Sequence, residues 1–333
     1  MPREILVLRE SEIRQVLDME SCIDAMARAF TSYSAGEAEL PDVIHLNVPE
    51  HDGEIHIKTG HLHGEPFFAV KVASGFYENP ALGLPSSDGM VAVFDATTGG
   101  AAAFLLDNGY LTDLRTGAAG GVAARHLAPA EPEVVAVVGT GAQARHQIDA
   151  LSRARSFREV RVWGRDEGRA RACAADLAAL PAIPEGCRVS VAATVAEAVD
   201  GAAVVVTVTA SQEPLVRPEW IAPGAHVTAV GSDGPDKQEL DGGVLAAADL
   251  VVADSLPQCL RLGEIHHAVD AGVLRAEDVV ELGRITAGAA PGRTSENQRT
   301  VADLTGVGVQ DVAAANLVMR RADGAGMGVR IER

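Results

Sequence analysis

Between residues 130 and 255 the chain alternates short apolar runs with segments of helical periodicity, and this alternation constrains the fold most strongly. Several of the runs are continuous and rich in β-branched residues, which is typical of strands covered on both faces. They lie at Val134–Val138, Val160–Trp163, Val189–Ala192, Val204–Val208, His226–Val230 and Leu250–Ala253. Helical stretches such as Ala142–Ala154 and Glu167–Leu180 separate them. The pattern predicts an α/β fold with a doubly wound parallel sheet.

A glycine turn joins the first of these strands to the first helix. It has the pattern G-x-G-x-x-A and comprises Gly139, Thr140, Gly141, Ala142, Gln143 and Ala144. The first glycine permits the turn, the second lets a pyrophosphate approach the backbone, and the alanine allows close packing of helix on strand. The free N–H groups of the helix would then face the anion. We predict a dinucleotide site here, because the motif opens a strand-helix series; the alternative is a structural corner.

The end of the second strand bears on which dinucleotide is bound. An acidic residue at this place would hold the ribose hydroxyls of NAD. Here the segment reads VRVWGRDEG, with Gly164 at the expected place, then Arg165 and Asp166. Because a missing acid beside an arginine suits a 2′-phosphate, the sequence favours NADP. Asp166 could instead turn inward and serve NAD, so we expect NAD(P)H as the cofactor.

The first 128 residues have a different pattern, typical of an α+β domain. Two amphipathic helices are expected at about Ser11–Leu17 and Ser21–Ser34. Strands are expected at Glu54–Lys58, Phe67–Val72, Val91–Phe94 and Ala101–Leu106. A helix rich in Ala and Gly follows, and Pro129 and Pro132 mark a linker. Periodicity does not decide which domain the last helix, GVQDVAAANLVMRR, belongs to.

Composition and charge argue against several classes of function. The 333 residues are 47% hydrophobic and 22% charged, which suits a globular protein with a sizeable core. A net charge of -18 without any basic run argues against nucleic-acid binding. No apolar run approaches the ~20 residues that a membrane helix needs, and no signal segment is recognised. The four cysteines are scattered, so a reducing, cytoplasmic location is expected.

Two lysines and an arginine of the first domain are candidates for binding an anion. Lys71 lies inside the apolar strand FFAVKVASGF, where a buried ammonium is costly unless it is paired. It would either face a substrate carboxylate, which we favour, or protect an edge strand. Lys58, at the end of GEIHIKT, is a weaker case. Arg115 is expected in the first turn of the Ala/Gly-rich helix, with Thr112 as the N-cap, as either an anion ligand or an ordinary surface arginine.

Asp233 lies just beyond the carboxyl end of a predicted core strand, where ligands bind in open α/β sheets. A carboxylate there can serve as a general acid or base. The alternative is a turn-forming aspartate before Gly234 and Pro235. Lys237 is close enough in sequence to pair with it.

Histidines gather early in the chain without a metal-binding spacing. They are His45, His51, His56, His61 and His63. Because no H-x-x-x-H helix or Cys/His spacing is present, we expect surface histidines and no metal site.

The combination of Lys71 with LTDLRTGAA, VVGTGAQARHQ and VGSD resembles the ornithine cyclodeaminase/μ-crystallin family, and RLGEIHHA and DLTGVGVQD extend the likeness along the chain. The resemblance implies a substrate-binding and dimerisation domain at 1–128, completed by 306–333. It implies a Rossmann dinucleotide-binding domain at 129–305 and a homodimer.

Site residues carry over from this resemblance position by position. Lys71 and Arg115 match residues that hold the substrate carboxylate, and Asp233 matches the acid/base of the cyclodeaminase. The matches to cofactor contacts are Ser86, Arg115, Gly139, Gly141, Ala142, Gln143, Gly164, Arg165, Thr209, Val230, Lys237 and Thr305. One departure is Val43, where many members carry an arginine. Lys58 could supply that charge from a neighbouring strand, and the change puts ornithine itself in doubt.

The segments HDGEIHIKTG, GFYENPALGLPSSDG and LLDNGYLTDLRTGAA resemble one branch of the family, that of the ectoine-utilisation and iminosuccinate reductases. We therefore expect an NAD(P)H-dependent reductase of a small α-imino acid, either iminosuccinate-like or an intermediate of ectoine degradation. One alternative is a cyclodeaminase, which borrows NAD and returns it unchanged. The other is a binding protein like μ-crystallin, which binds thyroid hormone; aromatic residues at 4% of the chain disfavour an aromatic pocket.

Overall fold

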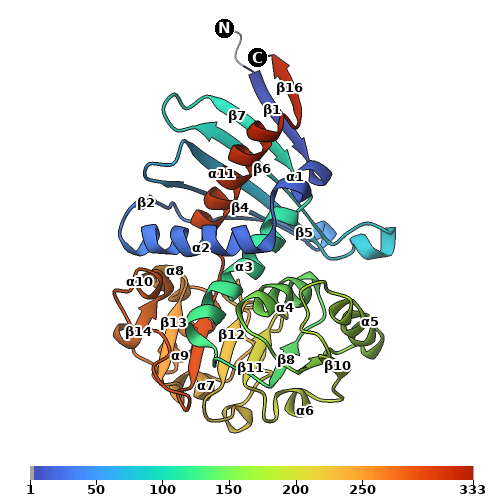
Figure 1. Ribbon diagram of the computed structural model, residues 1–333, viewed down its shortest axis with the longest axis vertical. Coiled ribbons are helices and arrows are strands. Elements are labelled where there is room, and N and C mark those ends of the chain that lie inside the picture. The colour runs from blue at the N-terminus through green and yellow to red at the C-terminus, as the bar shows by residue number, and fades with distance from the viewer. Residues whose placement is uncertain (1–3, 333) are drawn as a thin grey trace. The chain divides into compact units, whose positions relative to one another are not determined.

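Contacts divide the chain into two units in the computed structural model, which describes residues 4–332 (Figure 1). Unit 1 contains the described residues up to Arg115 and from Val307 onward, and unit 2 is Thr116–Gly306. The first division falls inside helix α3 (Tyr110–Leu127), not in the proline linker expected after residue 128. The helix is shared, because its start is bonded to Asp107 of unit 1 and the Thr116 carbonyl accepts a bond from Gln147 of unit 2.

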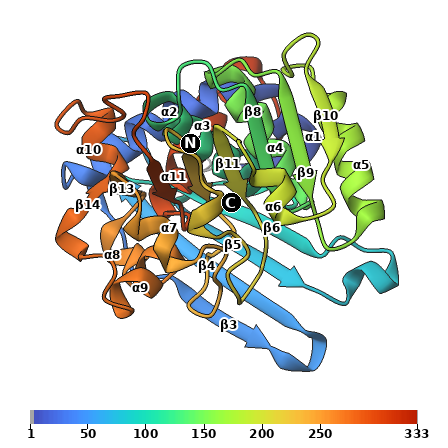
Figure 2. The same ribbon diagram turned by 90° about the horizontal axis from the view of Figure 1, so that it is seen from below.

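Unit 2 is built on a sheet of eight parallel strands in the order β10-β9-β8-β11-β12-β15-β13-β14. The strands are β8 (Val134–Val138), β9 (Glu159–Trp163), β10 (Arg188–Val191), β11 (Val204–Thr207), β12 (His226–Ala229), β13 (Leu250–Ala253), β14 (Val279–Glu281) and β15 (Thr300–Asp303). The neighbouring parallel strands are visible in Figure 2. The predicted α/β class with a doubly wound sheet is confirmed.

Helices connect these strands and cover the sheet. They are α4 (Ala142–Ala154), α5 (Glu167–Ala178), α6 (Val195–Val199), α7 (Gly242–Ala246), α8 (Leu256–Cys259), α9 (Gly263–Asp270) and α10 (Leu282–Thr286). Strand β8 shows why its sequence is continuously apolar. Val135 and Val137 belong to one hydrophobic core, whereas Ala136 and Val138 belong to a second. Because successive side chains of a strand point to opposite faces, the two cores cover the sheet on both sides.

Unit 1 is built on a mixed sheet in the order β16-β1-β7-β6-β5-β4-β2, with β3 also paired to β4. The strands are β1 (Glu4–Arg9), β2 (Ala38–Glu39), β3 (Ile44–Val48), β4 (Gly53–Leu62), β5 (Phe67–Phe76), β6 (Ser87–Asp95), β7 (Ala101–Leu106) and β16 (Val329–Glu332). Pairing is parallel between β1 and β7 and antiparallel in the other pairs. The antiparallel β3–β4 hairpin is visible in Figure 2.

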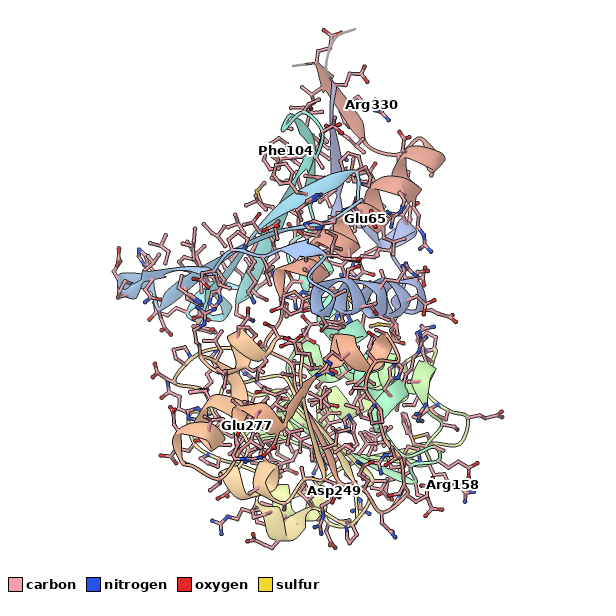
Figure 3. The ribbon with its side chains drawn as sticks, turned by 90° about the vertical axis from the view of Figure 1, so that its left-hand side faces the viewer. Glu65, Phe104, Arg158, Asp249, Glu277 and Arg330 are labelled. Carbon is pink, nitrogen blue, oxygen red and sulfur yellow. The ribbon has the colours of Figure 1, made fainter. Side chains whose placement is uncertain are left out.

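Three helices complete unit 1: α1 (Glu10–Val16), α2 (Met19–Ser34) and α11 (Gly308–Ala325). Helix α11 contacts β4, β5 and α2, so the last helix belongs to unit 1. Along β7, Ala103 and Leu105 are fully buried. Phe104 between them lies on the sheet face away from α11 (Figure 3). The helices therefore cover one face of this sheet.

Three structural findings bear on the excluded classes of function. Within residues 4–332, no helix combines the length and the apolar character needed to cross a bilayer. In the same range, no three His, Cys, Asp or Glu side chains form a group that could hold a metal ion. All four cysteines are free thiols, and Cys22, Cys173 and Cys259 are buried.

Candidate functional site

The glycine turn of unit 2 has the geometry that its sequence predicts. Gly139 has φ +126°, and a Cβ there would lie 2.7 Å from the Val208 carbonyl oxygen, so glycine is required. A Cβ at Gly141 would meet no heavy atom within 4 Å, so space is open where helix α4 begins. Ala144 is fully buried against the sheet. These features match the three roles in a dinucleotide fingerprint.

The end of β9 carries a glycine at the ribose position, packed against the Thr140 side chain. A Cβ at Gly164 would lie 2.5 Å from the Thr140 methyl group. The Asp166 side chain caps α5, accepting a hydrogen bond of 2.7 Å from the Arg169 N–H. Arg165 and Arg171 line an open groove of about 780 Å³ beside this strand end. One Asp166 oxygen thus stabilises the start of a helix, and a contact of this side chain with the ribose of NAD stays a prediction.

The loops after β11 and β12 carry further predicted residues. Thr209 follows β11, and Val230 directly follows β12 and is buried. Lys237 donates to Asp233 with a distance of 2.7 Å between Nζ and Oδ1, which confirms the predicted pairing. Both side chains remain partly exposed. Asp233 thus lies beyond the carboxyl end of β12 with an ammonium beside it, and its role as an acid or base stays a prediction.

Glu239 is a residue of this region that the sequence did not reveal. Its side chain is fully buried and accepts hydrogen bonds from the Thr207 hydroxyl and from the N–H groups of Thr209 and Gly231. Burial raises the pKa of Glu239 to about 7, against these hydrogen bonds, which lower it. No local pattern distinguishes this acid from the others in PDKQEL, because its burial depends on the chain returning to β11.

Thr305, another predicted cofactor contact, is buried in unit 2. Its hydroxyl donates to Asp254 over 3.0 Å and accepts from the Gln258 amide over 2.9 Å. The hydroxyl is thus engaged inside the protein, and its contact with a cofactor stays a prediction.

Unit 1 buries a cluster of cations. Lys58 of β4 and Lys71 of β5 are direct cross-strand partners, and Arg115 comes from α3. Lys71 and Arg115 are only 2% and 3% exposed. Strand β5 lies between β4 and β6, so the edge-strand alternative for Lys71 is wrong. The surface alternative for Arg115 is likewise wrong. Because like charges directly opposite one another repel, the cluster requires anions.

Asp311 of α11 supplies one such anion and was not identified from the sequence. Its Oδ1 lies 3.2 Å from the Lys71 Nζ and 3.0 Å from the Arg115 Nε. The Gln310 amide oxygen accepts a further bond of 3.2 Å from Arg115. The other Asp311 oxygen, Oδ2, is buried without a hydrogen-bond partner among the described residues. Asp311 therefore holds both cations at defined positions while keeping one oxygen unsatisfied.

Burial and neighbouring charges shift the pKa values of the groups in this cluster. Burial lowers the pKa of Lys71 to about 7, opposed by Asp311 and helped by Arg115 and Lys58. Although burial acts to raise it, these three cations hold the pKa of Asp311 below its usual value. Burial raises the pKa of Asp107, which is also nearby, to about 6. Two buried basic side chains, Lys71 and Arg115, thus share a single carboxylate oxygen of Asp311 in a desolvated place.

The start of α3 differs from the prediction. The helix begins at Tyr110, and the Leu111 N–H donates to the Asp107 carboxylate over 2.8 Å. Thr112 therefore lies within the first turn and is not the N-cap, and Arg115 lies in the second turn. The helix can begin earlier because Gly109, with φ +86°, lets the chain turn into it directly.

Two other predicted positions lie at the edges of unit 1. Ser86 precedes β6 and is exposed, and its carbonyl accepts a bond of 2.7 Å from the Phe76 N–H. Val43 precedes β3, which pairs with β4, the strand of Lys58. The structure thus places Lys58 on the strand adjoining the position of the missing arginine, and the substitution of one cation for the other stays a prediction.

Comparison with known proteins places this geometry among related enzymes. The model of the ornithine cyclodeaminase/mu-crystallin family matches residues 3–326. An uncharacterized cyclodeaminase of Sinorhizobium fredii is 43% identical, with 95% of this chain and 96% of that protein covered. Alanine dehydrogenase of Archaeoglobus fulgidus is 35% identical over 99% of this chain and 98% of its own length. Iminosuccinate reductase of Paracoccus denitrificans is 32% identical over 98% of this chain and all of its own length.

Solved structures give the same result. An archaeal alanine dehydrogenase dimer with bound NAD superposes with a TM-score of 0.90 at 34% identity, covering 99% of both chains. The Δ(1)-pyrroline-2-carboxylate reductase of Thermococcus litoralis, in complex with NADH and L-proline, superposes with a TM-score of 0.92 at 28% identity. That match covers 98% of this chain and 100% of the other. These relatives are nicotinamide-dependent reductases and dehydrogenases of imino and amino acids. The chain is a member of the ornithine cyclodeaminase/mu-crystallin family.

Proposed function

We propose that the protein is an NAD(P)H-dependent reductase that converts a small α-imino acid to the amino acid. The observation that carries the proposal is the burial of Lys71 and Arg115 on a single carboxylate oxygen of Asp311. A buried cation is stable when an anion or a hydrogen-bonding acceptor compensates it. Because the two cations share one oxygen of Asp311, an α-carboxylate is the ligand that their charge fits best.

The side chains divide the work of binding the substrate. Arg115 can bind a carboxylate with two parallel N–H bonds, and Lys71 adds a point charge. Together they would fix the distance and the face of the imine. Lys58, in register with Lys71, would hold a second carboxylate or a polar tail. A dicarboxylic substrate related to iminosuccinate is therefore one candidate, and the intermediate of ectoine degradation is another.

Proton control is the second task of the protein. When bound, the reduced nicotinamide cofactor supplies the hydride that adds to the C=N carbon. Asp233, or Lys71 through a water molecule, would keep the imine nitrogen protonated, which makes that carbon electrophilic. A lysine with a pKa of about 7 can hold or release a proton near neutral pH, which suits this role.

The geometry at the end of β9 supports NADPH as the preferred cofactor. Position 164 is a glycine and so offers no acid to the ribose, and one Asp166 oxygen is bonded to the start of α5. Arg165 would then face the 2′-phosphate. NADH is the alternative, since related structures contain NAD or NADH. The remaining predicted contacts, from Gly139 to Thr305, would hold either cofactor.

A cyclodeaminase is the second candidate function, because a relative with 43% identity carries that name. Such an enzyme would oxidise a diamino acid to the imine, let the distal amine attack the imine carbon and expel ammonia, and return the hydride to the cyclic imine. Its cofactor would show no net change. Asp233 would then act as the acid or base. A non-catalytic binding protein is the third candidate function.

One assay separates these candidates. Purified protein is mixed with NADPH or NADH, ammonium and a panel of oxaloacetate, pyruvate and glyoxylate. A reductase consumes reduced cofactor in proportion to the amino acid formed. A cyclodeaminase releases ammonia from ornithine without a net absorbance change, and a binding protein does neither. Failure of every imino acid to oxidise either cofactor would overturn the proposal.

The uncovered face of the unit 1 sheet supports a homodimer. Phe68 and Phe94 are stacked across strands with ring centroids 5.0 Å apart. Phe104 shares their face, since it pairs with Ala92, two residues before Phe94 on the same strand. Further apolar residues on this face, alternate to the buried ones, are Ile44, Leu46, Val70 and Val72. An apolar sheet face of this kind is typical of an interface, and the archaeal relative is a dimer.

The dimer is tested by placing a charge on this face. Phe104→Glu should shift the molar mass measured by light scattering from that of a dimer to that of a monomer. Glu277→Lys, on the exposed surface of unit 2, is the control for a change of charge. A wild-type protein that is monomeric would contradict this part of the proposal. We expect such a reductase to work in the cytoplasm, where thiols like the four free cysteines stay reduced.

A further inference from the structure

We propose that Glu239 is a positioning residue that fixes the two loops expected to contact the nicotinamide cofactor, those following β11 and β12. This inference rests on the proposed function, since it concerns how the cofactor is held. The Glu239 carboxylate accepts hydrogen bonds from the Thr207 hydroxyl and from the N–H groups of Thr209 and Gly231. It would act through the backbone of Thr209 and Gly231.

A single carboxylate joins the two loops. The Glu239 Oε1 accepts the Thr209 N–H, whereas Oε2 accepts the Gly231 N–H at 2.8 Å and the Thr207 hydroxyl at 2.7 Å. The ladder between the strands ends with the bond from Val230 N–H to the Thr207 carbonyl. Beyond that bond, the Glu239 carboxylate joins the two chain segments by accepting the N–H groups of Thr209 and Gly231.

The loops after β11 and β12 approach each other closely at Thr209 and Gly231. A Cβ at Gly231 would lie 2.0 Å from the Thr209 carbonyl oxygen and 2.5 Å from the Thr209 nitrogen. It would also lie 2.7 Å from the Glu239 carboxyl carbon. Any side chain at position 231 would therefore separate the loops. Close approach without a ladder requires another source of attraction, and the carboxylate supplies it.

Glu239 is itself held by two more buried carboxylates. Glu264 accepts the N–H groups of Glu239 and Leu240 at 2.7 and 3.0 Å. Asp303, at the end of β15, accepts the N–H groups of Glu264 and Ile265 at 2.8 and 2.9 Å. This series runs from the end of one strand to the loops after two others. Each acid fixes the backbone that carries or adjoins the next.

The geometry requires a carboxylate and not an amide. Both oxygens of Glu239 face N–H donors, and an ionised carboxylate can accept at both. A glutamine offers one acceptor oxygen and one NH₂ group. Whichever way it turns, its NH₂ group would face either the Thr209 or the Gly231 N–H. Glu239→Gln therefore releases one loop while leaving the volume of the core unchanged.

The test compares Glu239→Gln with Glu264→Gln, which makes the same substitution one step further from the loops. NADPH and NADH binding is measured by cofactor fluorescence without substrate, and melting temperature is measured in parallel. Steady-state kinetics follow with cofactor deuterated at C4. We expect Glu239→Gln to weaken cofactor binding about tenfold, about 1.4 kcal/mol. It should also slow hydride transfer about tenfold, so that a larger fraction of the deuterium isotope effect is expressed.

Glu264→Gln should lower the melting temperature to a similar degree but change cofactor binding less than threefold. Equal cofactor affinities for the two variants would overturn the inference, because a purely structural role predicts equal effects. If Glu239→Gln does not fold, Thr207→Val provides the test. It removes one donor to Oε2 with little change of shape, and it should weaken cofactor binding two- to threefold; unchanged binding would overturn the inference.

The two proposals fail in different ways. A wild-type protein that binds reduced cofactor but reduces no imino acid would overturn the proposed function, while cofactor binding would still test Glu239. A wild-type reductase whose Glu239→Gln variant matches Glu264→Gln would overturn the role of Glu239 alone. A wild-type protein that binds neither cofactor would overturn both.

Discussion

Each unit buries ionisable side chains, but their hydrogen-bonding partners differ. Unit 2 buries Glu239, Glu264 and Asp303, whose recorded hydrogen bonds come mainly from backbone N–H groups. Unit 1 buries Lys71 and Arg115 on a shared Asp311 oxygen, with Lys58 nearby. The carboxylates of unit 2 are satisfied by the protein's own backbone. The cations of unit 1 are bonded to side chains of α11.

This difference separates a structural use of buried charge from a binding use. A buried group whose hydrogen bonds are complete within the fold stabilises a particular backbone arrangement. A buried group whose charge is incompletely compensated can bind a ligand of opposite charge, which supplies the missing partner. The comparison therefore supports two proposals: that unit 1 recognises the substrate, and that buried acids position loops in unit 2.

The largest effect is expected from removing the cations of unit 1. Lys71→Ala and Arg115→Ala should each lower kcat/KM about 100-fold or more, since a lost charged partner costs about 2–5 kcal/mol. Oxidation of reduced cofactor in the presence of keto acid and ammonium measures this change. Arg320→Ala, which removes an exposed pair with Glu65 in the same unit, is the control. Near-normal kinetics in both variants would contradict a binding role for the buried basic residues of unit 1.

The next effect concerns the one carboxylate that both cations share. Asp311→Asn leaves like charges buried together and should lower the free energy of unfolding by about 3–5 kcal/mol. Urea unfolding measures this loss. Succinate or oxaloacetate should raise the melting temperature of the variant more than that of the wild type, because the added anion replaces the missing charge. Asp323→Asn, on the exposed end of α11, should change neither quantity.

The pH dependence of stability probes the acids of unit 2. Burial raises the pKa of Glu239 from 4.5 to about 7, so the folded state binds its proton more tightly than the unfolded state. The resulting stabilisation is present below pH 4.5 and is lost as pH rises to about 7, on the order of 3 kcal/mol. Glu239→Gln should remove this component.

Urea unfolding of both proteins from pH 4.5 to 8 measures the difference. The stability of the wild type relative to Glu239→Gln should fall across this range. A difference that stays constant with pH would show that Glu239 does not change its protonation on unfolding.

The smallest effect concerns the choice of cofactor in unit 2. Arg165→Ser should reduce the preference for NADPH over NADH about tenfold, roughly 1.4 kcal/mol for one phosphate contact. The ratio of kcat/KM values for the two cofactors measures it. Arg158→Ser, an exposed arginine just before the same strand, is the control. A wild-type enzyme that prefers NADH would remove this role from Arg165.

The sequence predicts unit 2 more closely than unit 1. The bounds of β8, α4 and β13 agree with the predicted ones, because continuous apolar runs and a helical period leave few alternatives. β15, of four residues, was missed inside the same unit. In unit 1, β1 and β16 were missed, and all four residues of β16 are exposed. Their pairing depends on chain segments from opposite ends of the sequence, which no local pattern records.

The same limit applies to the candidate site. Lys71 was found because one charge interrupts an apolar strand, which is a local signal of burial. Asp311 lies 196 residues from Arg115 and resembles any acid in the first turn of a helix. Glu239 likewise becomes special only when the loops of two strands meet. Sequence reasoning identified a charged residue that interrupts an apolar strand, as Lys71 does. It missed Asp311 and Glu239, whose partners come from distant segments of the chain.

The antiparallel pairing of β1 with β16 has a consequence for biosynthesis. Residues 307–332, which carry α11 and β16, leave the ribosome after the whole of unit 2. Unit 2 can therefore acquire its structure during translation, whereas the early strands must wait for their last partners. Until then the nascent chain exposes the β1 edge and the lysines without Asp311. A chaperone that covers the incomplete sheet of unit 1 would act before α11 and β16 have been synthesised.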